Sequence, residues 1–444
     1  MPNSPLSRRQ LLVSGLALAS NAQLTSRVWA QAAPQGSQGT GRLVVVMLRG
    51  AYDGLSAFVP YTDSDYYASR PNIAIAAPDG SDQTAIKLDR TFALHPALAP
   101  MLPMWQQGVL SFVPSAGLPA PNRSHFAAQY EMEIGQSGKT SAAAGWLNKV
   151  ANQDKTAVSL IGVGEANPAI LAGDAQVKLI ARGQAAQRTG VLANDKTRSA
   201  LMDLYAGNDN VSEAFRQGAG SRMQSAQELN REKVEMDGRR MGPAMDRRLD
   251  KDGTPPTPQA QNAQMLAASN GASDPIGLQL DAQHLGTLMR NDQHLRLGFL
   301  SAGGWDTHAN QGHATGQLAN NLGNLGRAIA QLRQDFSEPG DVVVVMSEFG
   351  RTAAENGTRG TDHGFGNAIW LIGNRVNGGR WHGQWTGLAR GNLNEARDLP
   401  AHHDYRAVLA QVLRGTCGLP DSAMASVLPG ARWDTRLDSL MRKT

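Results

Sequence analysis

Residues 43–54, LVVVMLRGAYDG, decide the fold: an apolar run from Leu43 to Leu48 ends in a tight polar turn that contains Asp53. An unbroken apolar run of this length is typical of a strand that is buried on both faces of a mostly parallel sheet. Val342 to Met346 has the same pattern. We therefore expect the chain to be built around a sheet of buried strands.

Strand and helix patterns alternate along the chain. Two further strands are predicted, Val109 to Pro114 and the stretch from His294 that breaks at Gly303, and the chain turns helical from Ser124 to Ile134. Apolar residues at helical spacing from Leu318 to Leu332 link two of the strands, which makes one βαβ unit. This alternation predicts an α/β fold with a doubly wound, mostly parallel sheet flanked by helices.

The composition changes between about residues 208 and 274, where charged and Gln-rich segments surround a Pro-rich stretch at Gly253 to Pro258. We interpret this segment as a helical or irregular insertion in one domain that spans residues 42–444. Two interpretations of the insertion stay open: a cap or lid over a site, or a surface insertion without a role.

The first 30 residues have the pattern of an export signal. Ser7 to Leu12 contains the pair Arg8-Arg9, and the apolar stretch Leu11 to Leu18 that follows is shorter than the roughly 20 residues needed to cross a bilayer. We expect cleavage near Ala30, a disordered tether over residues 31–41, and a periplasmic or extracellular protein without stable membrane insertion. The twin-arginine translocase is the expected partner during export.

The charge argues against a nucleic-acid-binding protein, and the cysteine content excludes an internal disulfide. The formal net charge is +4, and removal of the first 30 residues takes away three arginines and no acidic residue, so the mature chain is near neutral. This charge does not predict a nucleic-acid-binding protein. Cys417 is the single cysteine, so no internal disulfide forms and the core must supply the stability.

Carboxylates and imidazoles gather where the predicted strands end. These side chains are candidate ligands for one or two divalent metals, because carboxylate and imidazole donors suit zinc, and also manganese, iron, calcium or magnesium. In open α/β sheets the carboxyl ends of the strands form the ligand sites. The candidates are Asp53, Asp306, His308, Glu348, Asp362 and His363. Alternatives stay open for four of them: an Asp-Gly turn for Asp53, a helix cap for Asp306, a surface position for His308, and an ion pair with Arg351 for Glu348.

Ser124 is the candidate nucleophile, since it stands at the expected N-terminus of a helix, where N–H groups and the helix dipole favour an anion. Its neighbour Arg123 is a candidate clamp for an oxyanion. Serine is also a good N-cap, and an arginine is often simply exposed, so structural roles remain open for both residues.

Five motifs together resemble a known family. They are Leu48 to Leu55, Arg123 to Phe126, Gly303 to His308, Ser347 to Thr352, and Gly360 to Gly364. Over nearly its whole length the chain resembles the twin-arginine-exported bacterial proteins grouped as domain of unknown function 1501, which are placed in the alkaline-phosphatase-like superfamily. The resemblance implies a doubly wound sheet, two divalent metals, and hydrolysis or transfer of phosphate or sulfate esters.

By position, the resemblance assigns Ser124 as the nucleophile, Asp53 as the first-strand metal carboxylate, Asp306 and His308 as one metal pair, and His363 as a late ligand. The chain departs from the superfamily pattern where Glu348-Phe349 replaces Asp-His. It also lacks the x-Pro-x-Arg sequence after the nucleophile that a formylglycine sulfatase requires.

These observations predict an exported metal-dependent hydrolase that acts on a small-molecule or polymer ester. The alternative is a non-catalytic exported binding or assembly protein that retains the fold. A lyase or transferase is not excluded by the sequence.

Overall fold

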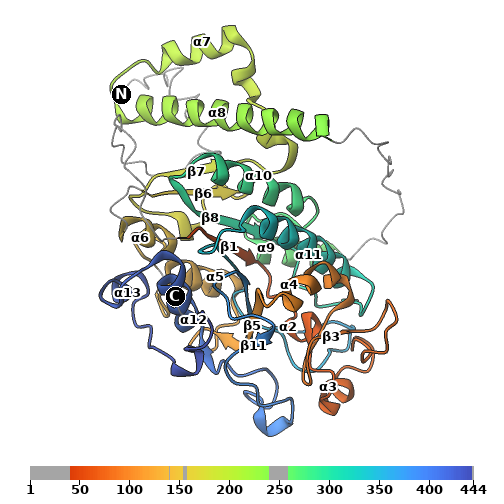
Figure 1. The fold of residues 1–444 in the computed structure, drawn as a ribbon. Helices are drawn as coiled ribbons and strands as arrows, with labels where there is room; N and C mark the ends of the chain where they lie inside the picture. The colour runs from red at the N-terminus through yellow and green to blue at the C-terminus, as the bar shows by residue number, and fades with distance from the viewer. Residues whose placement is uncertain (1–40, 140, 154–157, 240–258, 443–444) are drawn as a thin grey trace, which may run out of the picture.

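The computed structural model describes residues 41–139, 141–153, 158–239 and 259–442, and the predicted export signal and most of the predicted tether lie outside this part of the chain. The described residues form an α/β fold with a mixed, mostly parallel sheet flanked by helices (Figure 1). The strand order in the main sheet is β11-β5-β10-β9-β1-β8-β6-β7, with β12 beside β5. The strands are β1 (Leu43–Leu48), β5 (Leu110–Gly117), β6 (Ser159–Val163), β7 (Val177–Ile180), β8 (Leu295–Ala302), β9 (Val342–Met346), β10 (Asn367–Gly373), β11 (Arg380–Trp381) and β12 (His403–Asp404).

The strand directions bring four carboxyl ends to one edge of the sheet. Strand β1 pairs in parallel with β8 and with β9. Strand β10 is antiparallel to both β9 and β5, so β5 runs in the same direction as β1. The loops that follow β1, β5, β8 and β9 therefore leave the sheet at the same edge, as the sequence predicts for the strands that carry candidate ligands.

Helices cover both faces of the sheet, and β1 shows why its sequence is apolar throughout. Val44, Val46 and Leu48 pack in one core cluster with α10 (Leu278–Asn291) and α11 (Gln317–Asp335). The intervening residues pack in a second cluster with α5 (His125–Ile134), α6 (Trp146–Gln153), α12 (Tyr405–Cys417) and α13 (Asp421–Val427). The predicted βαβ unit is present as β8, α11 and β9, with β1 between the two strands.

A second, three-stranded sheet follows β1 along the chain. Its order is β2-β4-β3, formed by β2 (Phe58–Val59), β4 (Ala93–Leu94) and β3 (Ile86–Lys87), and it is accompanied by α2 (Gly54–Ala57) and α3 (Ser64–Ser69). It joins the main core through Phe58, whose ring stacks on Phe112 of β5 with the centroids 3.9 Å apart.

The expected insertion is helical where it is described. It contains α8 (Asn210–Arg239) and α9 (Gln259–Ser269), while residues 240–258 lie outside the described part. Helix α8 lies beyond β7 with α7 (Asp195–Leu204) (Figure 1). Helix α9 instead reaches the ligand edge, where Ala268 O accepts a hydrogen bond from Gln129. Among the described residues, no helix is long and apolar enough to span a membrane.

Candidate metal centre

The loops at the carboxyl edge bring three imidazoles and one carboxylate together. Asp306 and His308 follow β8, His363 lies between β9 and β10, and His125 is the first residue of α5, which follows β5. His125, Asp306 and His363 form a group whose ligand atoms all lie within 4.8 Å of one another. These residues are distant in sequence, and the strand order brings them together.

The ring nitrogens converge on one carboxylate oxygen. Asp306 Oδ1 is 3.4 Å from His125 Nε2, 3.1 Å from His363 Nε2 and 2.9 Å from His308 Nε2. His363 Nε2 is also 2.9 Å from His125 Nε2 and 3.0 Å from His308 Nε2. Two imidazole nitrogens at this separation share at most one proton between them, so the group offers lone pairs that a cation can take.

Each imidazole is fixed at its other nitrogen. The Nδ1 of His125 lies 2.7 Å from Glu348 Oε1, the Nδ1 of His308 lies 3.0 Å from Asp362 Oδ1, and the Nδ1 of His363 lies 3.1 Å from the carbonyl oxygen of Arg123. These partners are acceptors, so each Nδ1 carries the proton and donates it. This arrangement directs Nε2 toward the centre and is typical of histidines that bind a metal.

Two candidate ligands are therefore partners of histidines. Glu348 is fully buried, and its Oε1 accepts hydrogen bonds from Gly50 N at 2.8 Å and from Gln129 Nε2 at 2.9 Å as well as from His125. Its Oε2 accepts from the Ser347 hydroxyl at 2.8 Å. With these bonds the carboxylate of Glu348 lies behind His125, and the more exposed carboxylate of Asp362 lies behind His308.

Asp306 is the carboxylate at the centre. The buried guanidinium of Arg351 donates to its Oδ1 at 2.7 Å, and also to the carbonyl oxygens of Gly50, Ala51 and Trp305. The other oxygen, Oδ2, is buried and has no hydrogen-bond partner among the described residues. A buried carboxylate oxygen without a partner is costly unless an ion or water completes it.

The ionisation of the group without metal follows from these contacts. Burial opposes charge on His125, but hydrogen bonds with Asp306 and Glu348 raise the pKa of His125 to about 9. Burial also opposes charge on Asp306, but hydrogen bonds with the three histidines hold the pKa of Asp306 below its usual range. Burial lowers the pKa of His363, which favours the neutral imidazole that a metal requires.

Phe349 follows Glu348 and contacts two of the histidines. Its ring centroid lies 4.8 Å from that of His125 and 5.2 Å from that of His363. The ring packs against both imidazoles and offers no ligand atom. The described residues thus supply one clear group of donors at this edge.

Asp53 lies apart from this group. Its carboxylate is fully buried and accepts hydrogen bonds from Arg70 at 2.6 Å and 3.1 Å, from Ser56 at 2.7 Å and from Gln311 at 2.7 Å. These bonds hold the pKa of Asp53 below its usual range although burial opposes this. The sequence names Asp53 as a candidate ligand, and in the structure its oxygens accept hydrogen bonds from Arg70, Ser56 and Gln311.

Ser124 and Arg123 directly precede His125 at the start of α5. Ser124 is the N-cap of α5, is exposed, and makes no capping hydrogen bond with its side chain. The guanidinium of Arg123 donates to Glu395 at 2.8 Å and to Asp398 at 2.7 Å, so two carboxylates already neutralise it. Both contacts use its Nη2, and its Nε is buried without a hydrogen-bond partner among the described residues.

His125 is the residue that the sequence prediction omitted. It stands directly after Ser124, at the start of a helix whose buried face continues through Ala128, Gln129 and Met132. A histidine that opens this face, beside a candidate nucleophile, is the signal in the sequence that points to it. The buried face turns the imidazole inward and leaves Ser124 exposed.

The residues present fit a divalent cation. Imidazole nitrogens and a carboxylate oxygen are the donors that zinc and similar ions take, each histidine is oriented from behind, and Asp306 Oδ2 lacks another partner. His125, Asp306 and His363 would hold the ion, with His308 beside them.

Comparison with solved structures finds distant similarities. The alkaline phosphatase from the Antarctic bacterium TAB5 matches with a TM-score of 0.36 and 10% identity, over 86% of this chain and 100% of that chain. Ps i-CgsB in complex with k-i-k-neocarrahexaose matches with a TM-score of 0.35 and 9% identity, over 87% and 74% of the two chains. A mutant of the alkaline phosphatase PafA matches with a TM-score of 0.32 and 12% identity, over 71% and 64%.

A search of curated protein sequences finds no match. A family model matches residues 40–428, which is most of the chain. The chain therefore belongs to the family described as protein of unknown function (DUF1501).

Proposed function

We propose that the protein is an exported, metal-dependent hydrolase of phosphate or related sulfate-type esters. The observation that carries this proposal is the convergence of the Nε2 atoms of His125, His308 and His363 on Asp306 Oδ1. Zinc is the ion that we propose first, because it prefers imidazole and carboxylate donors. Manganese, iron, calcium and magnesium are the alternatives that elemental analysis separates.

A divalent ion in this group supplies Lewis-acid chemistry, which polarises an ester oxygen and offsets the charge that develops during ester cleavage. The chain supplies the orientation. Glu348 holds His125 and Asp362 holds His308, while Arg351 fixes Asp306. These hydrogen bonds keep the donor atoms in position before the substrate arrives.

Ser124 is the proposed nucleophile. Its hydroxyl is exposed beside His125, at the N-terminus of α5, where the helix dipole and the first N–H groups favour an anionic substrate group. Its Oγ forms the bond to phosphorus or sulfur as the ester oxygen leaves with a proton, and the proton of Ser124 passes to solvent. Water then releases the acid and restores the serine.

The test combines metal analysis with turnover. Elemental analysis of the purified full-length protein is expected to find divalent metal, and p-nitrophenyl phosphate and p-nitrophenyl sulfate serve as substrates. Ser124→Ala is expected to lose turnover by at least about a hundredfold and keep its metal, whereas Ser426→Ala, at an exposed serine of α13, changes neither. A metal-free wild-type protein would overturn the proposal.

A second candidate is a non-catalytic binding or assembly protein that keeps the centre. Two observations favour it: Phe349 packs on the imidazoles where a further ligand could stand, and Arg123 is paired with Glu395 and Asp398. This candidate predicts bound metal without turnover of either ester, and wild-type behaviour in Ser124→Ala.

The proposed export depends on the sequence Arg8-Arg9 followed by a short apolar stretch. Replacing both arginines with lysine is expected to retain the protein in the cytoplasm, and cell fractionation measures this. Export of the doubly substituted protein at the normal level would contradict the proposal.

A further inference from the structure

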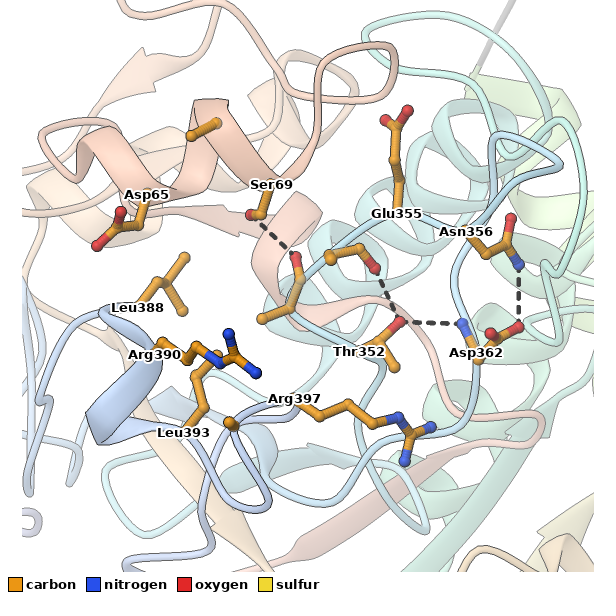
Figure 2. Close-up of a pocket in the computed structure, with 14 residues that line it drawn as sticks. Asp65, Ser69, Thr352, Glu355, Asn356, Asp362, Leu388, Arg390, Leu393 and Arg397 are labelled. Carbon is orange, nitrogen blue, oxygen red and sulfur yellow. Dashed lines mark hydrogen bonds between the residues drawn. The ribbon is translucent and has the colours of Figure 1, made fainter.

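A pocket of about 440 Å³ adjoins the metal centre. It lies between α3, the loop after β9, and the segment that contains Leu388, Arg390 and Arg397 (Figure 2). This volume is in the range that small-molecule sites have. Apolar side chains such as Ala68 and Leu388 line part of it, so the pocket can hold the neutral body of a ligand.

The pocket and the metal centre share a wall. Asp362 lines the pocket, and its Oδ1 lies 3.0 Å from His308 Nδ1. Arg397 lines it too, and its guanidinium donates to the carbonyl oxygen of His363 at 2.6 Å. Asp362 and Arg397 therefore stand between the pocket and the histidines of the centre.

The acidic residues of the pocket are occupied or directed outward. Glu355 accepts three hydrogen bonds from Asn72 and Ile73, and Asp362 accepts from His308 and Asn356. Figure 2 shows the carboxylates of Asp65 and Glu355 at the margins of the group, directed away from its middle. Asp65 and Glu355 therefore point away from the interior of the pocket, and Asp362 is hydrogen-bonded to His308 and Asn356.

Arg390 is the second arginine among the lining residues. Its side chain is exposed and makes no hydrogen bond or ion pair with any residue that the structure describes. Figure 2 shows its guanidinium directed into the space between the lining residues. A guanidinium has five N–H donors and pairs with two oxygens of a carboxylate, phosphate or sulfate at once.

We propose that this pocket binds an anionic group of the substrate, a carboxylate, phosphate or sulfate, through Arg390. This inference rests on the proposed function, because it places the reacting ester at the metal centre and a second oxyanion of the same molecule in the pocket. The substrate class is then an ester with a neutral body and two negative groups, such as an acidic sugar ester.

The test uses isothermal titration calorimetry on the metal-loaded full-length protein with three probes. Glucose 6-phosphate has one anionic group, 6-phosphogluconate adds a carboxylate, and fructose 1,6-bisphosphate adds a phosphate. The wild-type protein is expected to bind at least one probe with two anionic groups about fivefold more tightly than glucose 6-phosphate, and the better of the two identifies the oxyanion.

Arg390→Gln is expected to abolish this preference and leave the affinity for glucose 6-phosphate nearly unchanged. Arg432→Gln, at an exposed arginine outside the pocket, removes the same charge and should keep the preference. Equal affinities for all probes, no binding of any probe, or a preference that survives in Arg390→Gln would overturn the inference. The metal content of the same samples decides the proposed function separately.

Discussion

The side-chain amide of Gln311 donates a hydrogen bond to Asp53 Oδ2 at 2.7 Å, although the two residues lie 258 positions apart. The Oε1 of the same amide accepts hydrogen bonds from the hydroxyls of Thr307 and Thr361, each at 2.9 Å. Thr307 stands between the two candidate ligands that follow β8, and Thr361 stands two residues before His363 in the loop between β9 and β10. Gln311 thus joins both ligand-bearing loops to the first-strand carboxylate.

Gln311→Leu is expected to weaken zinc binding about tenfold, because the two loops lose the bond that sets their separation. It also leaves buried hydroxyls without a partner, at a cost of about 1–3 kcal/mol each. Competition with a chelator measures the affinity on protein that is still folded. Gln317→Leu, at the half-buried start of α11, is the matched control and should bind zinc normally. Normal zinc affinity in Gln311→Leu would show that the loops hold their spacing without it.

Glu348→Gln is expected to lower the metal affinity about 10- to 100-fold, since the amide cannot replace the charged acceptor that holds His125 Nδ1. The size of the side chain is conserved, so the fold should persist, which circular dichroism checks. Glu395→Gln, on an exposed carboxylate paired with Arg123, serves as the control and should change the affinity by less than about threefold. Unchanged zinc affinity in Glu348→Gln would contradict a role for Glu348 behind His125.

Asp53→Asn separates a structural role from metal ligation. Breaking the buried ion pair with Arg70 is expected to cost about 3–5 kcal/mol of unfolding free energy. Metal content per folded molecule should change little, because no ligand atom is lost from the group at Asp306. Denaturant unfolding and elemental analysis measure the two quantities. Loss of metal from a variant of normal stability would restore Asp53 as a ligand.

Local sequence patterns predict much of the fold. The run from Leu43 to Leu48 is apolar at every position, and the structure buries both of its faces, as parallel strands require. The strand end before Asp306 and the loop that contains His363 follow equally local signals. Since the carboxyl ends of parallel strands lie at the same edge of a sheet, the sequence alone predicts that Asp306 and His363 lie close together.

The remaining site residues depend on contacts between distant segments. His125 reaches the centre because β10 is antiparallel to both neighbours and so turns β5 in the direction of β1, and no local pattern encodes this reversal. Glu348 follows β9 as predicted. Hydrogen bonds from Gly50 N and Gln129 Nε2 hold its carboxylate on the Nδ1 side of His125, away from the centre. Spacing in the sequence does not determine such side-chain directions.

The free energy of unfolding should decrease as the pH is lowered, because the buried His95 is neutral in the folded chain. Its Nδ1 accepts a hydrogen bond from Ala97 N at 3.0 Å, and its Nε2 lies 3.0 Å from the carbonyl oxygen of His313, so the folded chain holds the neutral imidazole. Burial lowers the pKa of His95 from 6.5 to about 4. Between these pH values His95 is protonated in the unfolded chain and neutral in the folded chain. The contribution is therefore complete above pH 6.5 and is lost as the pH falls toward 4.

His95→Asn removes this titration and keeps an acceptor for Ala97 N, so it tests the assignment. Unfolding in urea with EDTA present is expected to show about 3 kcal/mol less loss of stability between pH 6.5 and pH 4 than in the wild type, because each pKa unit corresponds to about 1.4 kcal/mol. His294→Asn, at an exposed histidine, should follow the wild-type curve. Carboxylates that titrate in the same range act in all three proteins and cancel in the difference. Parallel curves of unfolding free energy against pH for His95→Asn and the wild type would mean that folding does not lower the pKa of His95.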